Sequence, residues 1–135
     1  MIDIFISSET YRIDGDHLVF NAINPVLEKL KEKDYGTEFV DIGIIPVIMP
    51  TDWHDAYKER VLLKRKAKEA DIRLYIDYNK YLKADKNGRI LLFWQTIIKS
   101  IKAINDRKKG DFAGDRLVDD LLLEIGMSID ELNAI

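Results

Sequence analysis

The clearest indication of the fold comes from VLLKRKAKEADIRLYIDYNKYLKAD, Val61 to Asp85. Apolar or aromatic residues alternate with polar ones in its second half: Ile72, Leu74, Ile76 and Tyr78. This two-residue period is typical of a strand with one buried face. The preceding run, 58–68, alternates as well, but it also fits the end of a helix that begins at Asp55. Between the two, KEAD supplies a turn of about four residues. We therefore expect an antiparallel pair of strands. Its lysines would lie on the solvent-exposed outer face and prevent edge-to-edge aggregation of the sheet.

The flanking segments add strands and helices. Residues 2–7 alternate like a strand, and residues 38–50 fit one bent strand or two short ones around Pro46. Apolar residues recur at helical spacing in three segments: 17–33, 85–109 and 114–126. Helix caps are predicted at Asp16, at Asp85 and in the capping box Ser128 to Glu131. The predicted fold class is α+β, a single layer of mainly antiparallel sheet with about four strands and helices packed on one face.

Length and composition restrict the possible classes. A chain of 135 residues without a Pro/Ser-rich linker predicts one domain, 1–135. The absence of cysteine excludes disulfides, thiolate zinc sites and cysteine nucleophiles. The N-terminal stretch lacks the basic start of a signal peptide, and no apolar run reaches the ~20 residues that span a bilayer. We therefore expect a cytoplasmic protein without a membrane partner.

Charge is distributed in three blocks. Residues 1–57 carry a net charge of −7, residues 58–109 carry +10, and residues 110–135 carry −6. Blocks of opposite sign can attract partners, and they can equally balance one another within the fold. A small nucleic-acid-binding module that uses the basic 58–109 block, with tyrosines available for base stacking, is therefore an alternative function. No established nucleic-acid-binding motif accompanies the block.

Catalytic chemistry has little support in the sequence. The chain contains no phosphate-binding glycine motif and no nucleophile elbow, and His17 and His54 share no metal-binding spacing. Asp14 and Asp16 fit a turn followed by a helix cap. Asp77, expected in mid-strand, fits either a cross-strand ion pair or the catalytic carboxylate of a small hydrolase. We therefore predict no catalytic residue, no metal site and no enzyme activity.

One segment is similar to a known family. In residues 57–104 a basic strand leads into ADIRLYIDYNKYLKAD and then into an apolar helix that contains IIKSIKAI, and DRLVDDLLLEIG follows an aromatic residue, Phe112. This arrangement resembles the immunity protein 44 family of bacterial polymorphic-toxin systems. The resemblance implies a non-enzymatic, cofactor-free inhibitor that binds the toxin domain of a contact-dependent or secreted toxin. It carries over no catalytic residues.

Two loops offer residues for binding such a partner. Interface energy is concentrated in a few aromatic and arginine side chains surrounded by weaker contacts. The segment PTDWHDAY contains an aromatic residue beside acids, and the region after the first strand contains further acids. The predicted partner-binding residues are Asp52, Trp53, His54, Asp55 and Tyr57, together with Glu9, Asp14 and Asp16. Trp53 could alternatively fold back into the core. The acidic ends of the chain could oppose a basic, nucleic-acid-degrading toxin and accelerate association.

Overall fold

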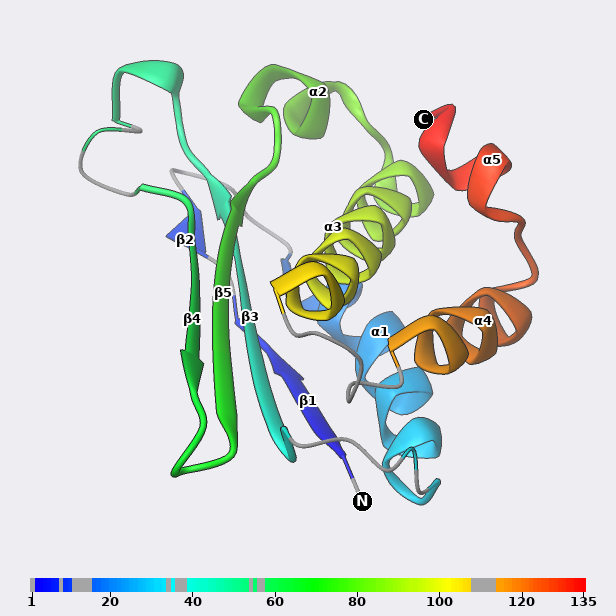
Figure 1. Cartoon of the computed structure of the whole chain (residues 1–135). Helices are drawn as coiled ribbons and strands as arrows, with labels where there is room; N and C mark the ends of the chain where they lie inside the picture. Colours follow the sequence, from blue (N-terminus) through cyan, green and yellow to red (C-terminus); the bar gives the residue numbers. More distant parts are fainter. Residues whose placement is uncertain are drawn as a thin grey trace.

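The computed structural model describes residues 2–7, 9–10, 16–33, 35, 39–53, 55, 58–107 and 114–135. Its elements in chain order are β1 (Asp3–Ile6), β2 (Glu9–Thr10), α1 (Asp16–Lys31), β3 (Asp41–Ile48), the 3₁₀ turn η1 (Thr51–Trp53), β4 (Arg60–Lys64), β5 (Glu69–Tyr75), α2 (Tyr78–Lys83), α3 (Lys86–Arg107), α4 (Gly114–Ile125) and α5 (Ile129–Asn133). Figure 1 shows α1, α3, α4 and α5 on one side of a single sheet. The expected α+β class with helices on one face is therefore confirmed.

The sheet is mixed, so the expectation of a mainly antiparallel sheet is wrong. The strand order is β1-β3-β5-β4, with β2 also paired to β3. β1, β2 and β5 all run parallel to β3, whereas β4 and β5 are antiparallel. Helix α1 carries the chain from β1 back to the start of β3, which makes those two strands parallel. The alternation of apolar and polar residues has the same period in both kinds of pairing, so it could not distinguish them.

Pro46 lies inside one continuous strand, β3, with neighbours on both sides. The carbonyl of Ile44 accepts a hydrogen bond from the Ser7 backbone N–H at 3.1 Å. In a parallel ladder the next donor from β3 towards this edge would be the N–H of residue 46, which proline lacks. Pairing along the edge accordingly stops at Ile6 and resumes at Glu9. The proline therefore divides the neighbouring edge strand rather than its own.

The β4–β5 hairpin agrees with the predicted antiparallel pair and settles the choice for 58–68 in favour of a strand. Its turn comprises residues 65–68 rather than the expected KEAD, because β5 already begins at Glu69. Lys68 adopts a left-handed backbone with φ of 56°. Glycine or asparagine usually occupies such a position, so a lysine there does not allow the turn to be located from the sequence.

The core lies between the sheet and α3. The expected apolar stripe on this helix is confirmed, and its fully buried members include Phe93, Ile97, Ile101 and Ile104. Helix α3 contacts β3, β4 and β5, while α1 covers β1, and α4 packs against both α1 and α3. No described helix is both long and apolar enough to cross a lipid bilayer.

Two of the predicted helix caps are also confirmed, at Asp85 and in the capping box of Ser128 and Glu131. Asp85 Oδ1 accepts a hydrogen bond from the Gly88 backbone N–H at 2.8 Å, next to the start of α3. Gly126, with φ of 70°, follows the end of α4, as expected for a residue that leaves a helix in the left-handed conformation. The capping box of Ser128 and Glu131 is present at α5. Helix α1 contains Pro25 and continues through it as one helix.

A buried tyrosine fastens α4 to the rest of the helical layer. The Tyr35 hydroxyl donates to Asp120 Oδ2 at 2.5 Å, and Lys33 Nζ lies 3.4 Å from the same oxygen. The hydrogen bond from Tyr35 is the main reason that the pKa of Asp120 lies below its ordinary value, and Lys33 contributes in the same direction. Burial, followed by the neighbouring carboxylate, raises the pKa of Tyr35.

The Tyr35→Phe substitution tests this contact through pH. Because the pKa of Asp120 is lower in the folded state, its contribution to stability is present above the ordinary value of 3.8 and is lost as pH falls through the folded pKa. We expect the variant to lose about 1–2 kcal/mol of unfolding free energy at pH 7. The difference from wild type should shrink below about pH 3.5. Denaturant unfolding between pH 7 and pH 2.5 measures both.

Lys29→Met is the matched control, because its largely exposed ion pair with Glu124 reaches the same helix, α4, that carries Asp120. Such a pair contributes on the order of 0.5 kcal/mol or less. A Tyr35→Phe deficit that stayed constant down to pH 2.5 would contradict the hydrogen bond to a charged Asp120.

Candidate functional site

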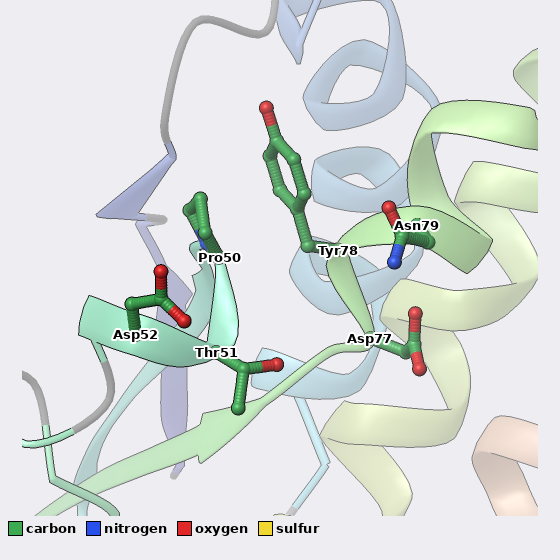
Figure 2. A pocket seen from close by; sticks show the side chains of 6 residues that line it. All are labelled: Pro50, Thr51, Asp52, Asp77, Tyr78 and Asn79. Atoms are coloured by element: carbon green, nitrogen blue, oxygen red, sulfur yellow. The ribbon is translucent and has the colours of Figure 1, made fainter.

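One candidate site lies beyond the carboxyl ends of the parallel strands β3 and β5. Ligands of open sheets with parallel strands commonly bind at this end, because the loops that follow the strands converge there. Here η1 follows β3 and α2 follows β5. They border a cavity of about 310 Å³, which we call the strand-end cavity, lined by Pro50, Thr51, Asp52, Asp77, Tyr78 and Asn79 (Figure 2).

Local backbone structure positions both walls of this cavity. In the first wall, the Trp53 N–H donates to the Pro50 carbonyl at 2.9 Å and closes the 3₁₀ turn. In the second, Asp77 is the N-cap of α2, and its Oδ1 accepts from the Lys80 backbone N–H at 2.9 Å. Figure 2 shows the Tyr78 side chain standing between Pro50 and Asn79.

This arrangement corrects the sequence interpretation of Asp77. It lies after the end of β5, not in mid-strand, and its carboxylate caps a helix, so the expected cross-strand ion pair is wrong. Its position between Ile76 and Tyr78 continued the alternation of the strand by coincidence, since Ile76 is buried and Tyr78 begins the helix. Capping satisfies a backbone N–H that would otherwise have no partner within the helix.

The strand-end cavity is poorly suited to carboxylate chemistry. Asp52 and Asp77 come from opposite walls, and Asp77 is already engaged in its cap (Figure 2). General acid–base catalysis by two acids needs both carboxyl groups directed at one bond. Within the described residues, no group of three or more histidine or carboxylate side chains could hold a metal ion. The cavity therefore offers a polar surface in which one of the two carboxylates is already hydrogen-bonded.

A second candidate surface lies on the side of the sheet opposite the helices. A hollow of about 330 Å³ opens there, lined by Phe5, Asp41, Glu69 and Asp71. Phe5 is 52% exposed, which is unusual for a phenylalanine in a strand. We call this the open-face hollow. Sequence reasoning missed it, although the alternation of Ile4 and Ile6 already placed Phe5 on the opposite side of its strand.

The comparisons with known proteins give one result. The family model described as Immunity protein 44 matches residues 3–125, nearly the whole chain. The chain belongs to the immunity protein 44 family. The expected resemblance over residues 57–104 is thus confirmed and extends into the N-terminal third. No curated protein and no solved structure gives a significant match.

Membership of the immunity protein 44 family supports an immunity role, and families of this kind are generally non-enzymatic. For a protein that acts by binding, the relevant features are exposed aromatic and charged side chains on a fixed scaffold. The strand-end cavity has exposed acids beside the half-buried Tyr78, and the open-face hollow has the exposed Phe5 beside half-buried acids.

The structure describes some of the predicted binding residues of this family member. Asp52, Trp53 and Asp55 are all exposed, and Trp53 is 44% exposed, so it is not a core residue. Asp55 borders a further hollow together with Lys58, Arg60 and Arg73. Asp52 and Trp53 lie in η1, which follows β3, and Asp55 comes shortly after η1.

The remaining predicted residues are only partly described. Glu9 belongs to β2, and its backbone pairs with that of Val47 in β3. Asp16 is the first residue of α1. Because Val47 lies near the end of β3, the backbone of Glu9 and the 3₁₀ turn occupy the same end of the sheet. The side chains of Glu9 and Asp16 lie outside the described part of the chain, as do His54, Tyr57 and Asp14.

Substitution of Asp77 distinguishes a structural cap from a catalytic carboxylate. Asp77→Ala should lower the unfolding free energy by about 1 kcal/mol, whereas Asp77→Asn should change it by only a few tenths, because asparagine caps helices as well as aspartate does. Thermal and denaturant unfolding measure both variants. A hydrolytic activity of the wild type that Asp77→Asn abolished would contradict the capping role as a sufficient explanation.

Proposed function

We propose that this protein binds and neutralises a cognate bacterial polymorphic toxin, contact-dependent or secreted, by direct protein–protein contact in the cytoplasm of the producing cell. The observation that carries the proposal is the immunity protein 44 match over residues 3–125. The strand-end cavity supports it as well, since it combines an exposed surface with carboxylates that are not arranged for catalysis. The protein acts as an inhibitor and not as an enzyme.

The surface around η1 is suited to such a contact. Trp53 is exposed and has Asp52 beside it and Asp55 shortly after it, also exposed. Tryptophan contributes more binding energy than most residues when a partner removes it from water. The neighbouring carboxylates would orient a basic partner and accelerate its approach. A toxin that acts on nucleic acid fits this chemistry, because it must itself carry a basic surface to attract phosphates.

The arrangement of the basic block gives less support to the nucleic-acid alternative. Lys64 lies 3.3 Å from Asp71 and forms an ion pair on the open side of the sheet. Lys99 and Lys102 are exposed on α3, which lies on the helical side. Affinity for a phosphate backbone requires many cations along one track. Here the sheet divides the block between its two sides (Figure 1).

The deciding experiment is a titration with the toxin domain encoded beside this gene. A stoichiometric complex with nanomolar or tighter affinity, together with protection of cells that express the toxin, is the expected result. No complex with that domain, combined with salt-sensitive retention of RNA or DNA, would overturn the proposal in favour of the nucleic-acid module.

Trp53→Ala should weaken toxin binding by about 2 kcal/mol or more, as expected for an aromatic residue at the centre of an interface. The fold should be retained, since this side chain is outside the core. Calorimetric titration measures the affinity, and circular dichroism checks the fold. Leu123→Ala is the control, because Leu123 is 78% exposed on α4. Equal affinities for the Trp53 variant and wild type would remove η1 from the interface.

A further inference from the structure

The open face of the sheet is ordered in rows by the strand register. One row crosses four strands and consists of Phe5, Gly43, Asp71 and Leu62. The adjacent row consists of Asp3, Asp41, Glu69 and Lys64. Residues aligned in this way direct their side chains to the same face of the sheet. In Figure 1 this is the side of β1, β3 and β5 away from α1, α3 and α4.

Phe5 lies across a glycine. A Cβ atom at Gly43 would be 2.9 Å from Phe5 Cε2 and 3.1 Å from Asp71 Oδ1. The missing side chain therefore leaves room for the aromatic ring beside a carboxylate on the surface of a central strand. Although one side of the ring packs in this way, half of the side chain stays in contact with solvent. Leu62 in the same row is exposed as well. The row thus presents apolar surface with an acid in its middle.

The adjacent row brings like charges together. Asp3, Asp41 and Glu69 are aligned on three neighbouring strands, and like charges directly opposite one another destabilise a sheet. Lys31 lies 3.7 Å from Asp3, and Lys64 pairs with Asp71. Within the described residues, Asp41 and Glu69 form no ion pair. Lys64 is aligned opposite Glu69, but its ammonium group forms its ion pair with Asp71, so the contact between Asp41 and Glu69 remains one of like charges.

We propose that the open-face hollow receives an arginine side chain from a basic segment of the toxin, an inference that rests on the proposed function. A guanidinium group can stack on an exposed aromatic ring and can donate paired hydrogen bonds to carboxylates. Phe5 supplies the ring, and Asp41 and Glu69 supply carboxylates without a cation of their own. Binding of the guanidinium group would relieve the repulsion between these acids. The complex would thus contain a cation that compensates the two carboxylates, which form no ion pair within the described residues of the free protein.

The other end of the same face carries the opposite charge and sets the orientation of the partner. Arg60 and Arg73 are aligned across β4 and β5, and they line a hollow together with Lys58 and a single acid, Asp55, so cations are in excess there. A basic segment of the toxin is repelled from these cations and attracted to the acidic row. Charge complementarity therefore places the cationic side chain of the partner at Asp41 and Glu69.

The test uses the double variant Asp41→Asn/Glu69→Gln and the toxin domain from the adjacent gene. Because the substitutions remove like-charge repulsion, we expect the Tm of the free protein to rise by about 1–4 °C. Toxin binding should weaken at least tenfold, and its dependence on salt should decrease. A purely structural role for these acids would lower the Tm instead. The double variant Asp115→Asn/Asp119→Asn, at two exposed positions on α4, is the charge-matched control and should leave the affinity unchanged.

Phe5→Ala tests the aromatic part of the hollow. It should weaken binding at least tenfold and lower the Tm by only a few degrees, because the ring is half-buried, and Leu123→Ala again serves as the exposed apolar control. If wild type neutralises the toxin and all the open-face variants bind it within twofold of wild type, this inference is overturned while the proposed function stands. Absence of any wild-type complex overturns both. A wild-type dimer that Phe5→Ala converts to a monomer would assign the face to a second copy and would also overturn the inference.

Discussion

The contact between α3 and one face of the sheet is the interaction on which the rest of the structure depends. Phe93 is fully buried there, with its ring edge-on to Phe20 of α1 at 5.6 Å and tilted against Tyr81 of α2 at 5.9 Å. One side chain of α3 thus joins three helices above the strands. Burial of each such aromatic side chain contributes roughly 1.5–3 kcal/mol. Helix α4 then packs against α3 and α1, and α5 packs against α3, so both extend the helical layer that α3 begins.

One-sided coverage has a direct consequence for the surfaces that can bind a partner. Because the helices lie on one side, the opposite face of the sheet remains open, and its side chains are held at positions set by the strand register (Figure 1). The loops at the carboxyl ends of β3 and β5 are anchored by short hydrogen-bonded turns and form the strand-end cavity. Both surfaces are therefore preorganised, which reduces the entropy lost on binding.

Membership of the immunity protein 44 family and these two surfaces both support a role in binding a protein partner. A protein that acts by binding a partner needs a stable core. It can tolerate surface residues that lower its unfolding free energy slightly. The helical side follows this division: Tyr35 and Asp120 form a short hydrogen bond that fastens α4. On the open side, Asp41 and Glu69 lie side by side without a cation between them. The first arrangement favours folding, and the second is the basis of the proposed arginine contact.

The sequence by itself determined the features that depend on nearby residues. It predicted the buried stripe of α3, the caps at Asp85 and Ser128 and the alternation in β5, because helical and strand periods and capping bonds span only a few positions. The residues of PTDWHDAY were likewise predicted to lie in a loop, and Trp53 is exposed there. Only the tertiary structure decided the parallel pairing around β3, because alternation is the same in both directions. Only the strand register could bring Phe5, Asp41 and Glu69 to one hollow, since they come from three strands far apart in the chain.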